Sequence, residues 1–119
     1  MEYLLMIHSE TSSNAEAVPE ATRQKMLSAY RAYTEALQGA GVIRGMNRLR
    51  PASSGTTVRV REGKTQVQNG PFIETREELG GYYLIDVPNL DAALSWAARC
   101  PGASHGTMEV RPIWPMDAY

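Results

Sequence analysis

Two side chains in this sequence have the chemistry to carry a proton, Glu74 and His8. Glu74 follows the turn signal Asn69-Gly70-Pro71 and is close in sequence to aromatic residues. A carboxylate held against aromatic rings can have its pKa raised for general acid or base work. His8 closes an apolar run, and histidine serves as a base or as a metal ligand. The plainer alternatives are a solvated charged connector around Glu74 and a polar residue that ends a strand at His8.

Three arginines stand at alternating positions of predicted strands: Arg59, Arg61 and Arg111. Guanidinium groups bind carboxylates and phosphates through two parallel hydrogen bonds, so strand pairing that brought Arg59 and Arg111 together would create an anion site. The alternative is that these arginines are edge-strand charges that discourage aggregation. The sequence allows both interpretations.

A small-ligand pocket is expected between the helices and the sheet, near residues 69–74. Hydrogen-bonding groups and aromatic rings are expected to line it. Some tyrosine hydroxyls should face this cavity, because buried hydroxyls need hydrogen-bond partners. The alternative for the rings is ordinary core, where most large apolar residues at helical or strand spacing lie. The expected ligand-binding residues are Asn69, Phe72, Thr75, Tyr82, Tyr30, Arg59 and Arg111.

Charge and cysteine content exclude several classes of protein. The chain has 12 basic and 13 acidic residues and no run of like charge, which argues against direct binding to nucleic acid or to an anionic membrane. Cys100 is the only cysteine, so an intrachain disulfide and a cysteine metal cluster are excluded. We expect no metal and no cofactor, because phosphate-loop, metal-ligand and nucleophile-elbow motifs are absent. Without a signal-peptide pattern or an apolar run of bilayer length, a cytoplasmic location is expected.

The candidate residues must be positioned by one domain, residues 1–119, because a chain of this length forms a single core. Apolar alternation and short apolar runs predict strands, while Pro19, Asn89 and glycines mark helix ends. The pair Gly80-Gly81 is expected to allow close backbone approach in the sheet. The buried stripe expected for the second helix is Leu90, Leu94, Ala97 and Ala98. A hairpin with a polar, basic outer face is expected around Glu62-Gly63. The predicted strands are Tyr3–His8, Val42–Leu49, Thr56–Arg61, Lys64–Gln68, Gly81–Val87 and Thr107–Ile113, and the predicted helices run from Pro19 to about Gln38 and from Leu90 to Arg99.

This order predicts an α+β protein with the ferredoxin-like βαββαβ plan, extended by an extra β-hairpin strand. Both helices then cover one face of an antiparallel sheet. The strands Tyr3–His8 and Gly81–Val87 are apolar on both faces, and a monomer rarely leaves such a surface in water. We therefore expect a two-fold homodimer in which two sheets pack face to face, as in a dimeric α/β barrel.

Several segments together resemble the DGPF-type branch of the YCII-related family. The resemblance implies a dimeric, ferredoxin-like α/β barrel, and some members of this branch occur beside or fused to extracytoplasmic-function sigma factors. The aspartate that names the branch is Asn69 here. The YCII branch itself has a His–Asp pair, whose places hold Tyr30 and Cys100, so the resemblance implies no activity through that pair. The matching segments are Tyr3–Ile7, Asn69–Phe72, Glu74–Glu77, Leu79–Ile85, Trp96–Pro101 and Val110–Ile113.

Three functions follow as hypotheses. The first is a cytoplasmic dimer that binds a small ligand, with a regulatory role as one possibility. The second is an enzyme that acts on a small carbonyl or aromatic compound, with Glu74 or His8 as proton carrier and Arg59 or Arg111 holding an anion. The third, suggested by the family resemblance alone, is a partner of a sigma factor.

Overall fold

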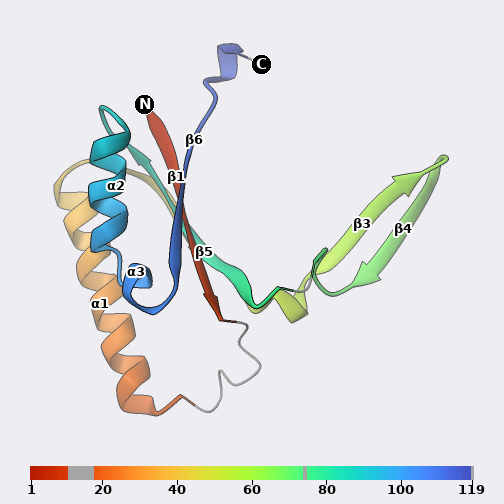
Figure 1. Cartoon of the computed structure of the whole chain (residues 1–119), viewed down its shortest axis with the longest axis horizontal. Coiled ribbons are helices and arrows are strands. Elements are labelled where there is room, and N and C mark those ends of the chain that lie inside the picture. The colour runs from red at the N-terminus through yellow and green to blue at the C-terminus, as the bar shows by residue number, and fades with distance from the viewer. Residues whose placement is uncertain (11–17, 74, 119) are drawn as a thin grey trace.

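The computed structural model describes residues 1–10, 18–73 and 75–118. Four antiparallel strands form a sheet in the order β2, β5, β1, β6, and two helices lie along one of its faces (Figure 1). This α+β arrangement is consistent with the predicted ferredoxin-like fold. The strands are β1 (Glu2–Glu10), β2 (Ile43–Arg48), β5 (Glu77–Asp86) and β6 (Thr107–Pro112), and the helices are α1 (Glu20–Gly39) and α2 (Leu90–Arg99).

The two central strands, β1 and β5, separate a buried face from a partly exposed one. Leu5 and Ile85 are fully buried on the helix side, whereas Leu4 and Leu84 point to the opposite face and remain partly exposed. Both faces are apolar, as the sequence predicts, but the helices cover only one. The core on the covered side consists of Tyr3, Leu5, Tyr33, Leu37, Tyr83, Ile85, Val87, Ala93, Ala97 and Cys100.

Aromatic contacts and hydrogen bonds join the helices to the sheet. The ring of Tyr33 on α1 meets that of Tyr83 on β5 edge to face, with centroids 5.2 Å apart. The Tyr33 hydroxyl donates to the carbonyl of Trp96 on α2 at 2.7 Å. Each buried hydroxyl therefore has a partner, because the Tyr83 hydroxyl also lies 2.9 Å from that of Thr34.

Helix α2 has the predicted bounds but a different buried stripe. Ala93 and Ala97 are buried, whereas Leu90 and Leu94, which we expected in the core, are exposed. Alanines allow the helix backbone to approach the sheet closely, and this approach turns the leucines outward. After α2 the chain forms a short helix that was not predicted, α3 (Gly102–His105).

Strand β5 starts earlier than expected, because Glu77–Leu79 are strand rather than connector. The glycine pair inside it has the predicted packing role at Gly81, where an added Cβ would lie 2.9 Å from the carbonyl oxygen of Asn47. The register between β1 and β5 slips between Ile7 and His8, opposite Gly80. This irregularity lies beside the end of β1, which carries His8 and Glu10.

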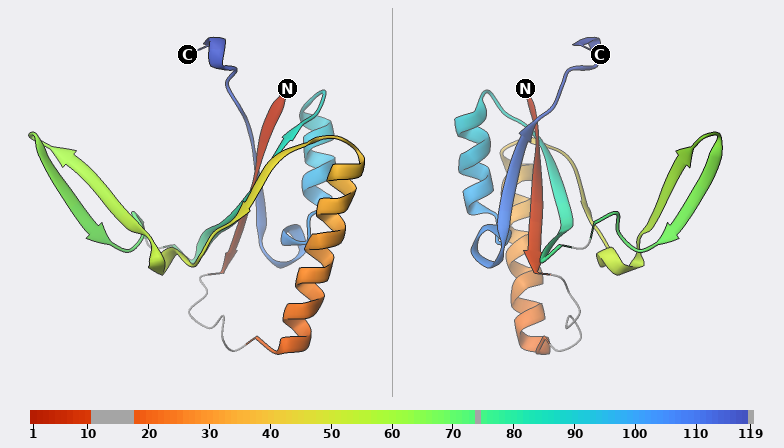
Figure 2. Two further views of the ribbon diagram at one scale, coloured as in Figure 1. Left: turned by 180° about the vertical axis from the view of Figure 1, so that it is seen from behind. Right: turned by 45° about the vertical axis from the view of Figure 1, so that its right-hand side comes forward.

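The predicted hairpin is present as β3 (Thr56–Arg61) and β4 (Lys64–Asn69). Its turn uses Glu62 and Gly63, both with positive φ, as the twist of a tight hairpin requires. The hairpin is not an extra strand of the main sheet, which corrects that part of the prediction. The short η2 helix (Ala52–Ser54) leads the chain out of β2, and the hairpin forms a separate two-stranded sheet that projects from one end of the body (Figures 1 and 2).

The projecting hairpin makes the molecule open in shape. The radius of gyration is 16.5 Å and the extents are 48 × 46 × 19 Å, whereas a compact domain of this length has a radius of roughly 13 to 14 Å. The C-terminal segment, with η3 (Met116–Ala118), also extends from the body and exposes Trp114 and Met116. None of the described helices has the length and apolar character needed to cross a bilayer.

Candidate functional site

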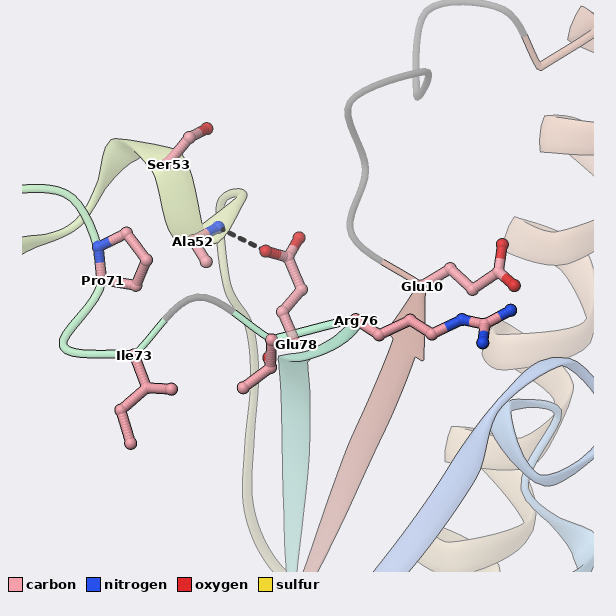
Figure 3. A pocket seen from close by; sticks show the side chains of 8 residues that line it. Glu10, Ala52, Ser53, Pro71, Ile73, Arg76 and Glu78 are labelled. Atoms are coloured by element: carbon pink, nitrogen blue, oxygen red, sulfur yellow. Dashed lines mark hydrogen bonds between the residues drawn. The ribbon is translucent and has the colours of Figure 1, made fainter.

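A groove of about 620 Å³ lies where the hairpin joins the body. Four segments meet there: the end of β1, the η2 helix, the connector between β4 and β5, and the start of β5 (Figure 3). The Glu78 carboxylate accepts a hydrogen bond from the backbone N–H of Ala52 at 3.1 Å, which ties β5 to η2. The groove is lined by Glu10, Ala52, Ser53, Pro71, Ile73, Thr75, Arg76 and Glu78.

The groove combines an apolar wall with charged and hydrogen-bonding groups. Pro71 and Ile73 supply apolar surface, and Ile73 is 61% exposed. Arg76 brings a guanidinium group and Glu10 a carboxylate, and both side chains extend away from Pro71 in Figure 3. Such a lining suits a small organic molecule with both apolar and polar parts.

Of the site residues expected within 69–75, the structure places one in the groove and two outside it. Thr75 lines the groove, and its hydroxyl donates to the carbonyl of Glu77. Asn69 ends β4, and Phe72 is exposed beside the hairpin rather than in the groove. Glu74 lies outside the described residues.

Arg59 and Arg111 do not form the predicted joint anion site. Arg59 belongs to the hairpin sheet, where its guanidinium lies 5.0 Å from the centroid of the Phe72 ring. Arg111 belongs to β6, which pairs with β1 in the main sheet. The two arginines are separated because the hairpin pairs with itself and not with the body.

On the open face of the sheet, His8, Glu109 and Arg111 form a chain of contacts. His8 pairs with Thr107 across β1 and β6, which brings Glu109 diagonally beside it on the same face. The His8 Nε2 atom lies 3.1 Å from Glu109 Oε1. Glu109 Oε2 accepts hydrogen bonds from Arg111 Nε at 2.9 Å and from Arg111 Nη2.

These contacts favour the ionised form of the Glu109 carboxyl. Hydrogen bonds from Arg111 lower the pKa of the Glu109 carboxyl, and the contact with His8 lowers it further. An ionised carboxylate only accepts hydrogen bonds, so Nε2 of a neutral His8 must be the donor. The Nδ1 atom of His8 is then left with its lone pair, which is the form of imidazole that accepts a proton.

Glu109 was not among the predicted site residues. Its alternation with Arg111 along a strand places both side chains on one face, and that was the available signal. Its pairing with His8, 101 residues away, depends on the register between β1 and β6. Sequence patterns alone do not fix that register.

The sequence model of the YCII-related domain matches residues 1–117. The chain belongs to the YCII-related family. A relative from Rhizobium meliloti (strain 1021), which is named as an uncharacterized protein, is 38% identical over 107 residues, covering 88% of this chain and 83% of the relative.

A solved structure shares the fold of this YCII-related protein. It is 5-chloro-2-hydroxyhydroquinone dehydrochlorinase (TftG) from Burkholderia phenoliruptrix AC1100, in complex with 2,5-dihydroxybenzoquinone. The TM-score is 0.55 and the sequence identity 13%, over 99% of this chain and 98% of the other. At this identity the likeness concerns the fold.

In this YCII-related chain, Tyr30 and Tyr82 do not line one pocket. Tyr82 lies on the open sheet face, where its hydroxyl accepts a hydrogen bond from Asn47 Nδ2 at 2.7 Å. Tyr30 lies on α1 and packs against the core on the covered face. The sheet therefore separates the two rings, and the structure does not bring them together.

Tyr30 and Cys100, the two positions singled out by the family resemblance, are close enough to interact, and both hold groups with raised pKa values. Burial raises the pKa of Tyr30 to about 12, with a contribution from Cys100. Burial also raises the pKa of the Cys100 thiol, which is 1% exposed. Both groups are therefore protonated near neutral pH and do not form a proton-transfer pair there.

Proposed function

We propose that this protein binds a small organic molecule with one anionic group in the groove at the base of the hairpin. The observation that carries the proposal is the groove itself, formed by the most distinctive stretch of the sequence. Its volume of about 620 Å³ lies within the roughly 300–1,000 Å³ typical of small-molecule sites. We therefore assign the small-ligand binding expected from the sequence to this groove, which lies at the end of the sheet.

The lining suggests the ligand's chemistry. Pro71 and Ile73 favour an apolar or aromatic body, and the Arg76 guanidinium favours a carboxylate or a phenolate, which it can hold in addition to a protein neighbour because it has five N–H donors. The Glu10 carboxylate disfavours a second anionic group and favours a hydroxyl donor. Hydroxylated aromatic acids and enolic carbonyl compounds combine these features.

A panel of benzoates and hydroxybenzoates, followed by two-dimensional NMR of the labelled protein, tests this function. Binding is expected to shift amide signals of Ala52, Ser53 and Thr75. Arg76→Met should weaken affinity about tenfold to a hundredfold, as for the loss of a charge-assisted hydrogen bond. Arg31→Met, on the exposed side of α1, is the matched control and should bind like the wild type. Equal affinity in both variants contradicts the proposal.

A second function, proton transfer, is favoured by the His8–Glu109 hydrogen bond. We propose that His8 Nδ1 takes a proton from a small carbonyl or aromatic compound bound on the open sheet face, while Glu109 orients the ring. The similarity in fold to TftG supports this to the extent that one enzyme with an aromatic substrate uses the same fold. Nitrogen NMR of the neutral form of His8 should report the Nε2–H tautomer.

Deuterium exchange tests the chemistry directly. Small ketones and quinols incubated with the protein in D₂O should lose α or ring protons faster than in buffer. His8→Gln should abolish this acceleration, and Glu109→Gln should reduce it. His105→Gln, which alters the other histidine, is the control and should leave it unchanged. Exchange that persists in His8→Gln rules out this role.

Both functions are proposed for a cytoplasmic homodimer, the assembly that the apolar open face of the sheet supports. The sigma-factor partnership stays a prediction from the family resemblance.

A further inference from the structure

One face of the β3–β4 hairpin carries three exposed valines beside the polar residues Thr56, Thr65 and Asn69. Val58 pairs with Val67, and Val60 stands two residues from Val58, so all three valines share a face. They are 60%, 65% and 59% exposed, respectively. The opposite face carries Arg59, Arg61, Lys64, Gln66 and Gln68. The hairpin therefore has the pattern of a strand pair that buries one face against another protein surface.

Within the described part of the chain, the valine face has nothing to pack on. All residues of β4 and five of the six residues of β3 are exposed. An isolated two-stranded hairpin is at best marginally stable in water. The alternation of valines with polar residues and the positive φ of Glu62 and Gly63 nevertheless favour the hairpin. We therefore expect a surface outside this chain to cover the valines.

The main sheet presents a second uncovered apolar surface. Leu4, Met6, Tyr82 and Leu84 lie on the face away from the helices, and each is partly exposed. In Figure 2 the hairpin of the same chain projects on the side of the sheet opposite the helices and diverges from the open face without lying on it. One chain therefore carries two apolar surfaces that are not in contact in this structure.

The chain exposes more surface than a compact monomer of its mass. A compact monomer of 13.1 kDa exposes roughly 6,400 Å², whereas this chain exposes 8739 Å². The surplus of about 2,300 Å² is similar to the surface that an extensive protein–protein interface hides. Each hairpin strand has six residues and spans about 20 Å, which is long enough to cross a four-stranded sheet.

We propose that the hairpin is an exchanged arm: in a two-fold homodimer, its valine face packs on the open sheet face of the partner. Two-fold symmetry makes this contact twice and covers all four surfaces. Hairpin-to-hairpin packing would leave both sheets open, and sheet-to-sheet packing alone would leave the valines in water. The inference rests on the proposed homodimer, and it does not depend on a ligand in the groove.

The exchanged arm also completes the site on the sheet. The partner's hairpin would cover the apolar surface beside His8 and exclude water from it, which strengthens the electrostatic contacts of Glu109. Arg59 and Arg61 would remain on the outer side of the arm.

Cross-linking between two single-cysteine variants tests the arm. Val58→Cys and an affinity-tagged Met6→Cys are mixed, unfolded and refolded together, and then oxidised; Cys100 is buried and stays in place. A disulfide between the two variants is expected as the main product. Arg59→Cys, one residue away but on the other hairpin face, should form little of it. Val58→Cys linked mainly to itself, or equal linking by Arg59→Cys, overturns the proposal.

A second test of the arm does not depend on the geometry of a disulfide. Val58→Asp with Val67→Asp should halve the mass measured by light scattering and leave the far-ultraviolet circular dichroism of the helices unchanged. Arg59→Asp with Gln66→Asp, the matched pair on the polar face, should keep the wild-type mass. A valine variant that stays dimeric shows that the arm does not form the interface, whether or not the groove binds a ligand.

Discussion

Glu109 is the residue on which the open-face site depends. It holds His8 on one carboxylate oxygen and Arg111 on the other, so the orientation of the imidazole and the charge of the site come from one side chain. Because Arg111 and His8 lower the pKa of this carboxyl, its ionised form is stabilised by folding.

That lowered pKa predicts how stability depends on pH. A carboxyl whose folded pKa lies below its ordinary 4.5 stabilises the fold above pH 4.5, and this stability is lost as the pH falls through the folded pKa. Glu109→Gln should therefore unfold at a lower temperature than the wild type at pH 7, with the difference shrinking below pH 4.5. Thermal unfolding monitored by circular dichroism measures it. Glu35→Gln, exposed on α1, is the control, and an unchanged difference at pH 3 would contradict the linkage.

His8 and Arg111 could be identified as candidates from the sequence, but the side chains that they contact could not. His8 and Arg111 were named as candidates because few side chains do acid–base or anion chemistry. Their link through Glu109 depends on strand register, and the separation of Arg59 from Arg111 depends on a hairpin that leaves the sheet. Local patterns specify neither, because both result from long-range pairing.

Gly81 shows a constraint that the sequence did indicate. The structure confirms the predicted close approach, since a Cβ at this position would lie 2.9 Å from the Asn47 carbonyl oxygen. Gly81→Ala should push β2 outward and cost about 1–3 kcal/mol of unfolding free energy. Gly80→Ala, whose Cβ would make ordinary contacts at 3.8 Å, should cost clearly less. Urea unfolding at one protein concentration compares them, and equal losses would argue against the steric explanation.

At the level of elements, end signals were better guides than buried stripes. Asn89 was predicted to cap α2, and its side-chain oxygen accepts a hydrogen bond from the backbone N–H of Ala92 at 2.9 Å. Of the buried stripe expected for this helix, Ala97 is buried, whereas Leu90, Leu94 and Ala98 are exposed. Packing through Ala93 and Ala97 decides which side of the helix faces the core. Capping depends on neighbours in sequence, whereas the buried side depends on the surface that the helix meets.

The cap gives a quantitative test at this scale. Asn89→Ala should lower the free energy of unfolding by about 1 kcal/mol, since the first turn of α2 loses its hydrogen-bond acceptor. Ser95→Ala, exposed in the middle of the same helix, should change it by less than half as much. Chemical unfolding of the two variants beside the wild type provides the comparison. A larger loss in Ser95→Ala would mean that the cap is not what holds the start of α2.

At the scale of the whole molecule, the strand and helix order predicted an α+β protein with an antiparallel sheet, which the structure shows. The apolar second face of the central strands predicts an assembly. What composition did not show is that the hairpin stands apart from the sheet. Its alternating pattern is the same whether it joins the main sheet or a partner, because both environments cover one face of a strand pair. The open shape and the surplus exposed surface appear only in three dimensions.

The central claim, that the chain functions as a homodimer, is tested most directly by sedimentation equilibrium of the unmodified protein at micromolar concentration. We predict a single species of twice the 13.1 kDa chain mass. A species with the mass of one chain across the micromolar range would contradict the homodimer, and the exchanged arm with it.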